Sequence, residues 1–327
     1  MPSWRKIPKV ELHLHADCSL SSAAIDTLTV DLTNRERQDY FPPSRVADLP
    51  EFLIYASRMV KLLQTEQSLR LMIRDVMKQV AEENCIYAEL RFAPHQHLEN
   101  GLSPTQVVEI VNDELSSAQK ITGVTARLIL CSLMHFDTQT SIEVVRLVEH
   151  FAGTNVVAFD IAGDSANFSF DAHKPATDLA RVLGVQMTIH AGESVGPESV
   201  AFALDRLGAQ RIGHGFRAVD DPKLLQRLIR DQIHLELCPQ NNIQTGNVLT
   251  LLEHPITRLR DLGAAFSISS DSRALTGDLT REYLLLSTNV GWTAMDFFRA
   301  NLMALDAAFL DEENKSRLKD RLTSEVF

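Results

Sequence analysis

The sequence predicts an α/β fold in which eight parallel strands close into a (β/α)8 barrel with a helical insertion after the first strand. Short apolar runs rich in β-branched residues alternate with segments of helical periodicity, which is the pattern of repeated βα units. From the second run onward the spacing is roughly 30 residues, about one βα unit. The runs cover residues 9–16, 87–95, 126–135, 156–164, 185–193, 211–216, 234–242 and 264–274.

The first run, KVELHLHA, has two imidazoles in an otherwise buried strand. Because side chains alternate along a strand, Glu11, His13, His15 and Asp17 are expected on one face. A single core histidine is usually hydrogen-bonded to backbone, but two histidines on one strand face are close enough to bind one cation.

The interval between the first and second strands, residues 17–86, is much longer than the others and ends in a predicted helix at 66–83. In a barrel, an insertion at this place lies over the mouth where active sites are built. We therefore predict that 17–86 is a helical lid within one barrel domain, 1–327; an elaboration that serves only packing is the alternative.

The segments between the later strands have helix signals. Ser103 is the predicted N-cap of 103–121 and Pro104 its first helical residue. Several others end on Gly or a polar residue, as helices commonly do. These further helices are predicted at 140–152, 175–184, 197–208 and 221–232.

Charge and cysteine content restrict the partners and the compartment. The chain of 327 residues has a formal net charge of -11 and no long basic run, which disfavours nucleic acid and favours a small-molecule partner. No apolar run is long enough to span a bilayer, and the N-terminal residues lack the apolar core of a signal peptide. The cysteines lie far apart without a CxxC pair, so we expect reduced thiols in a cytosolic protein; they are Cys18, Cys85, Cys131 and Cys238. The oligomeric state is not predicted.

Polar residues follow several strands at their C-terminal ends, where the βα loops of a barrel converge. His13 and His15 on the first strand, His190 on the fifth and Asp271 on the eighth would supply three imidazoles and one carboxylate. This ligand set suits Zn²⁺ with an open position for water, whose pKa the ion lowers to ~7. The sequence therefore predicts one zinc ion and hydrolytic chemistry.

Two further residues are candidates for proton transfer. Glu193, three positions after His190, can reach a substrate held at the metal without binding the metal itself; a carboxylate at a helix start is the alternative. His214 lies between two glycines in GHGF and could orient the attacking hydroxide or accept its proton. Those glycines allow the backbone to approach the site closely.

The motifs together resemble the adenosine deaminase family of metal-dependent barrel hydrolases. PKVELHLHADCS resembles the opening motif of the family, TIHAGE its HAGE, RIGHGF its GHG, and ELCPQNNIQTG its CP motif. LPEFL, YAELRFAPH, FDIAGD and SISSDSRALTGDLTREY follow the family in the same order, so the resemblance extends from about residue 8 to 310.

The resemblance implies a role for each matching residue. It implies that zinc is bound by His13, His15, His190 and Asp271, of which His15 and Asp271 also face the substrate. Glu193 would protonate ring N1 of a purine, and His214 would orient the hydroxide that attacks C6. Asp17 would bind the 5′ end of the ribose and the amide of Gly163 would contact N3. The products would be an inosine and ammonia.

Departures from the family pattern concern the substrate. Ser272 replaces the acid that usually follows the metal-binding Asp, and its hydroxyl can donate a hydrogen bond to N7. Ala16 and Cys18 replace the usual Leu and Gly next to the sugar. Family members acting on free adenine resemble one another in having Glu where this chain has Asp17, and those acting on nucleoside monophosphates tend to have Asn there. Asp17 thus favours a purine nucleoside without indicating which one. Adenosine and 2′-deoxyadenosine are the first hypothesis.

Other functions stay open at this point. The same chemistry could act on a 5′-modified adenosine such as 6-aminodeoxyfutalosine or 5′-methylthioadenosine, or on free adenine. A related barrel hydrolase could cleave an amide or ester, but its two-metal versions need a lysine at the end of strand four, where this chain has FDIAGD. A non-catalytic purine-binding barrel would not need all six polar site residues.

Overall fold

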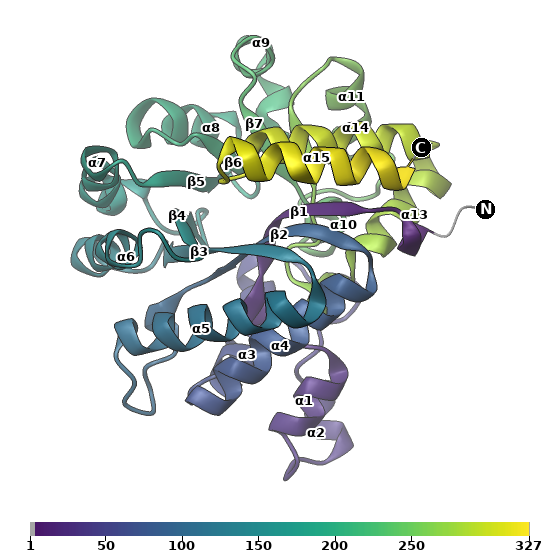
Figure 1. The fold of residues 1–327 in the computed structure, drawn as a ribbon. Helices are drawn as coiled ribbons and strands as arrows, with labels where there is room; N and C mark the ends of the chain where they lie inside the picture. Colours follow the sequence, from purple (N-terminus) through teal and green to yellow (C-terminus); the bar gives the residue numbers. More distant parts are fainter. Residues whose placement is uncertain (1–3, 327) are drawn as a thin grey trace.

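The structure, a computed structural model that describes residues 4–326, contains the predicted barrel (Figure 1). Eight strands are hydrogen-bonded in sequence order and each is parallel to the next. Every predicted run overlaps one of them, although β2 and β3 begin one or two residues before their runs. They are β1 (Lys9–His15), β2 (Cys85–Phe92), β3 (Thr125–Leu133), β4 (Val156–Ala162), β5 (Gln186–Ala191), β6 (Arg211–His214), β7 (His234–Leu237) and β8 (Phe266–Ile268).

The first and last strands meet at a seam that closes the barrel. Leu14 of β1 forms a parallel bridge with Asp271, which follows β8. The amide of His15 donates to the carbonyl of Asp271 over 2.7 Å, and the amide of Asp271 donates to the carbonyl of His13 over 3.1 Å. The seam therefore joins three predicted site residues through their own backbones.

All eight strands end before the predicted runs do, and three of these ends bear on the site. After His15 the chain turns into the 3-10 helix η2 (Ala16–Cys18), so Asp17 does not continue the strand face as predicted. Run 234–242 ends as a strand at Leu237 because Pro239, which lacks an N–H, begins a helix. Run 264–274 ends as a strand at Ile268, before the backbone reaches a φ of 65° at Asp271.

Helices surround the strands in Figure 1. The N-cap prediction at Ser103 is confirmed: its side chain accepts from the amide of Gln106 over 3.3 Å, and Gly123 ends the helix in the left-handed region. The helices after β2 are α5 (Pro104–Thr122), α6 (Thr138–His150), α7 (Lys174–Leu183), α8 (Pro197–Phe202) with the π-turn η5 (Ala203–Leu207), α9 (Pro222–Arg230), α10 (Pro239–Gln244), α11 (Ile256–Asp261), α12 (Arg273–Thr276), α13 (Leu279–Val290), α14 (Ala294–Ala307) and α15 (Glu312–Val326). Shorter 3-10 turns are η1 (Trp4–Lys6), η3 (Pro94–Gln96), η4 (Phe170–His173) and η6 (Phe216–Asp220).

The segment between β1 and β2 is helical, as predicted. It contains α1 (Ser22–Leu28), α2 (Asn34–Gln38), α3 (Leu49–Leu62) and α4 (Glu66–Glu82), of which α1 and α2 project from the barrel in Figure 1. The Asp48 side chain caps α3 by accepting from the amide of Glu51 over 3.0 Å. Helix α4 packs along β2 and α5 as a barrel helix. Helix α3 supplies side chains to the cavity described below.

A layer of paired charges fills part of the barrel interior. Arg91 donates to Asp160 over 2.7 Å and to Glu236 over 2.6 Å, and Arg211 donates to Glu236 over 2.8 Å. Burial alone would raise the pKa of Glu236, but the two guanidinium groups lower it to about 2. Glu236 is therefore an anion throughout the neutral range, buried directly beneath the site.

Among residues 4–326, no helix combines the length and the apolar character needed to cross a membrane. All the cysteines are buried free thiols, as predicted.

Candidate functional site

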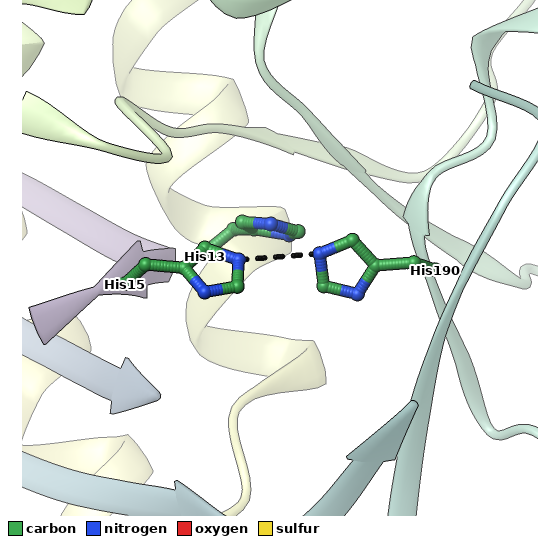
Figure 2. Close-up of side chains that lie close together, drawn as sticks. All are labelled: His13, His15 and His190. Atoms are coloured by element: carbon green, nitrogen blue, oxygen red, sulfur yellow. Dashed lines mark hydrogen bonds between the residues drawn. The ribbon is translucent and has the colours of Figure 1, made fainter. Parts of the chain in front are cut away.

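Imidazoles from β1 and β5 meet at the C-terminal end of the barrel, as Figure 2 shows for His13, His15 and His190. The Nε2 atoms of His15 and His190 are 3.2 Å apart. One of the two nitrogens must carry a proton to make this hydrogen bond, and a shared cation could take the place of that proton. His13, His15 and His190 form a group whose ligand atoms all lie within 4.8 Å of one another.

Asp271 brings a carboxylate to the same place. Its oxygens lie 3.9 Å from His13 Nε2, 3.8 Å from His15 Nε2 and 3.5 Å from His214 Nε2. His13, His214 and Asp271 form a second group with metal-binding geometry. The predicted ligand residues are therefore gathered at one point, although they come from opposite sides of the barrel.

Buried carboxylates fix how the imidazoles face. His13 Nδ1 is 2.9 Å from Glu236 Oε2, and His190 Nδ1 is 3.1 Å from Asp160 Oδ1. A carboxylate accepts, so each Nδ1 donates, and in a neutral ring each Nε2 is then an unprotonated nitrogen that faces the cluster. Accordingly His13 Nε2 is buried with no hydrogen-bond partner among the described residues. A buried acceptor without a hydrogen-bond partner can serve as a ligand of a cation.

The charges around the imidazoles differ. Burial holds the pKa of His13 and of His214 well below the usual value, and nearby cationic groups lower it further. Burial also acts to lower the pKa of His190, but Asp160 outweighs it and raises this pKa. A bound cation would compete with that proton on His190 and would replace its charge.

Backbone strain is concentrated at this site. His214 and Asp271 have φ values of 60° and 65°, in the left-handed region that residues with a side chain rarely occupy. Gly213 has no room for a side chain, since a Cβ there would lie 3.2 Å from His13 Cε1 and from the His190 ring. The glycine predicted to permit close approach does so at Gly213.

A cavity opens beside the cluster and has two unlike sides. The α3 side is apolar, and the side formed by strand ends is polar. The lining residues are His15, Cys18, Leu49, Phe52, Leu53, Ala56, Gly163, His190, Glu193, His214, Asn241, Asp271 and Ser272.

Glu193 is a buried acid facing this cavity. It follows β5 and lies before α8 begins, so it is not the helix-start carboxylate of the alternative interpretation. Its Oε2 is 3.6 Å from His214 Nε2. Burial, together with the negative charge of Asp271, raises its pKa to about 8. The side chain is therefore protonated near neutral pH and can donate a proton.

Of the predicted substrate-binding residues, some line the cavity and one does not. Gly163, with a φ of 99°, and Ser272 both line the cavity. The Ser272 hydroxyl donates to Asp271 Oδ1 over 3.0 Å. Asp17 is buried behind the wall, with Oδ2 3.7 Å from His97 Nε2, and it does not line the cavity itself. Burial would raise the pKa of Asp17, but His97 and His15 lower it below its usual value.

Sequence reasoning missed several contributors. Glu236 and Asp160, which orient two imidazoles, were visible as carboxylates inside the apolar runs HLELCP and FDIAGD. Asn242, whose Nδ2 is 3.2 Å from His214 Nδ1, had no signal of its own. The cavity side of α3 could not be identified, because helical periodicity does not say which apolar residues meet the barrel mouth.

Solved structures resemble this fold closely. An adenine deaminase from Arthrobacter aurescens has a TM-score of 0.90 at 24% identity, covering 98% of this chain and 99% of that one. An amidohydrolase from Burkholderia ambifaria with bound Zn has a TM-score of 0.91 at 21% identity, over 99% and 91%. Arabidopsis ADAL complexed with IMP has a TM-score of 0.89 at 23% identity, over 100% and 99%. At these identities the likeness establishes the shared barrel fold.

Sequence relatives are more similar. An adenosine deaminase of Enterococcus faecalis is 33% identical over 326 residues, covering 97% of this chain and 96% of the relative. One of Lacticaseibacillus casei is 34% identical over 325 residues with the same coverage. The model of the adenosine deaminase family matches residues 8–325. This match covers nearly the whole barrel, so the chain belongs to the adenosine deaminase family.

Proposed function

We propose that this protein is a zinc-dependent deaminase that converts adenosine and 2′-deoxyadenosine to inosine and 2′-deoxyinosine, with release of ammonia. The observation that supports it most directly is the position of Glu193, whose pKa burial raises, facing the same cavity as the cluster of His13, His15, His190 and Asp271. Relatives named adenosine deaminase, at 33–34% identity over nearly the full length, support the same activity.

The residues present fit a metal ion. We assign its ligands as the Nε2 atoms of His13, His15 and His190 and the carboxylate of Asp271, a set that suits Zn²⁺. The unpartnered His13 Nε2 and the carboxylates that fix two of the rings support the assignment. The bound Zn in one structural neighbour supports the choice of metal. When bound, the ion would activate a water molecule as the nucleophile by lowering its pKa.

The residues of the chain would supply the proton transfers. Protonated Glu193 would donate to ring N1, which makes C6 of the purine electrophilic as the water oxygen adds. His214, within 3.6 Å of Glu193 and 3.5 Å of Asp271, would orient that oxygen. The Asp271 carboxylate would contact the same oxygen from the other side. The 6-amino group would leave as ammonia, so one water is consumed for each ammonia released.

The substrate side of the site is part of the proposal. The amide of Gly163 would contact N3, and Ser272 would face N7 once its hydroxyl turns from Asp271. His15 would lie beside the substrate, and Asp17, behind the Cys18 wall, would interact with the 5′ end of the ribose. A nucleotide, IMP, is the ligand in the Arabidopsis neighbour, which supports a purine as the partner here.

The remaining assignments concern the whole chain. We take 1–327 as one barrel domain in which 17–86 is a lid, supported by the side chains that α3 contributes to the cavity. We take the cytosol as the compartment, supported by four buried free thiols.

A substrate screen tests the proposal. Ultraviolet absorbance reports deamination of adenine, adenosine, deoxyadenosine, AMP, methylthioadenosine and aminodeoxyfutalosine by the purified protein, and elemental analysis reports metal content. We expect turnover of adenosine and deoxyadenosine and about one zinc per chain. Preference for a 5′-modified nucleoside or for adenine would replace the substrate assignment, and failure of all six would end the 6-aminopurine proposal.

A further inference from the structure

A chain of hydrogen bonds runs from the backbone of α11 to the site. The amide of Ile256 is 3.1 Å from His254 Nδ1, and His254 Nε2 is 3.2 Å from Asn242 Oδ1. Asn242 Nδ2 is in turn 3.2 Å from His214 Nδ1. His254, Asn242 and His214 are all buried, with at most 3% of each residue exposed. We call these three side chains the relay.

The direction of each hydrogen bond follows from the first one. A backbone amide can only donate, so His254 Nδ1 must accept from Ile256. Burial lowers the pKa of His254 to about 3, so its ring is neutral and its single proton lies on Nε2. His254 Nε2 therefore donates to Asn242 Oδ1, which leaves the Asn242 amide nitrogen to donate to His214 Nδ1.

These hydrogen bonds fix the tautomer of His214, the last member of the relay. With Nδ1 of His214 accepting, the proton of its neutral ring must be on Nε2. That atom faces the cavity, 3.6 Å from Glu193 Oε2 and 3.5 Å from Asp271 Oδ2. The other tautomer would point a bare nitrogen at the Asp271 carboxylate oxygen.

We propose that His254 and Asn242 are positioning residues that hold His214 as the Nε2–H tautomer. His214 then acts as a hydrogen-bond donor to the attacking oxygen and does not accept its proton. This rests on the proposed function for the reaction, but the tautomer itself is a property of the chain. His254 does not line the cavity, and its hydrogen bond to Asn242 links it to the site.

Two substitutions of His254 separate its hydrogen bond from its packing. In His254→Gln the amide nitrogen takes the place of Nε2 and can still donate to Asn242. In His254→Asn the amide nitrogen takes the place of Nδ1 and cannot reach it. Both lose the ring contact with Phe216, centred 5.2 Å away, so both lose similar packing. We expect His254→Asn to lower kcat about tenfold with KM within about twofold, and His254→Gln to restore most of kcat.

A third variant reverses the relay. In Asn242→Asp both oxygens accept, so His214 must place a proton on Nδ1, and its neutral ring then has no Nε2–H. We expect kcat to fall about 100-fold while the fold is retained. Asn289→Asp makes the same chemical change at an exposed position of α13 and should leave kcat unchanged.

Nitrogen NMR of the zinc-loaded protein with ¹⁵N-labelled histidine reads the tautomers directly, because protonated and unprotonated ring nitrogens have well-separated shifts. We expect Nε2–H at both His214 and His254 in the wild type, and Nδ1–H at His214 in Asn242→Asp. A wild-type His214 with Nδ1–H would overturn the relay, as would equal kcat values for His254→Asn and the wild type. A wild type inactive on every nucleoside would reject the proposed function alone, since the NMR result still decides the tautomer.

Discussion

Glu193 has its functional proton because of where it is buried. Replacing it by Gln keeps the size and the neutral charge but removes the proton that would go to N1. We expect Glu193→Gln to keep its zinc, since the ligand atoms are untouched, while kcat falls about 100- to 10,000-fold. Metal analysis and steady-state kinetics on adenosine measure the two effects. Glu198→Gln, at an exposed position of α8, is the matched control, and normal turnover by Glu193→Gln would reject the role.

Glu282 is a buried acid that the proposed mechanism does not use. Its Oε1 accepts from the amide of Gln240 over 2.9 Å, whereas Oε2 has no partner among the described residues. Burial raises its pKa from 4.5 to about 8. The folded state thus holds a proton that the unfolded chain releases above pH 4.5, so stability falls as the pH rises towards 8.

Glu282→Gln should remove this pH dependence. One pKa unit corresponds to about 1.4 kcal/mol, so the free energy of unfolding should differ between wild type and variant by several kcal/mol at alkaline pH. We expect thermal unfolding of the variant several degrees above the wild type near pH 9 and close to it near pH 5. Glu313→Gln on exposed α15 is the control; equal melting at both pH values in all three proteins would contradict the prediction.

At the scale of elements, variants of α3 test whether the helical insertion contributes to substrate binding. Leu53 lines the cavity, and its neighbour Ile54 has 51% of its surface exposed. We expect Leu53→Ser to raise KM for adenosine about tenfold, because an apolar contact with the substrate is lost, and Ile54→Ser to leave KM nearly unchanged. Kinetics and thermal unfolding of both variants make the comparison, and equal KM values would remove α3 from the binding site.

The element pattern shows what the sequence could and could not predict. Eight strands and the helices between them were predictable because apolar runs and caps such as Ser103 are local signals. Strand ends were overestimated at 234–242 and 264–274, because run composition does not reveal where Pro239 or the backbone turn near Asp271 stops the pairing.

The candidate site was likewise predictable from the sequence only in part. Residues at strand ends, such as His190 and Asp271, could be placed together because barrel topology brings those ends to one face. His254 and Asn242 could not be linked to His214, since their contacts depend on how a loop folds back after β7. Asp17 was placed on a strand face that ends two residues earlier.

At the scale of the whole molecule, the charged barrel interior should keep the fold when the metal is removed. Glu236 and Asp160 stay paired with Arg91 and each still accepts from an imidazole. We expect dialysis against a zinc chelator to abolish turnover, retain the circular dichroism of the fold and lower Tm by several degrees, because a ligand of the native state stabilises it. Added zinc should restore turnover. Full activity of the metal-free protein would contradict the proposed mechanism.

The seam between β1 and Asp271 has a consequence for biosynthesis. His13 and His15 leave the ribosome long before Asp271, whose backbone bonds to both. The complete ligand set therefore cannot exist on a chain that stops before Asp271. We expect such fragments to lack tight metal binding and activity.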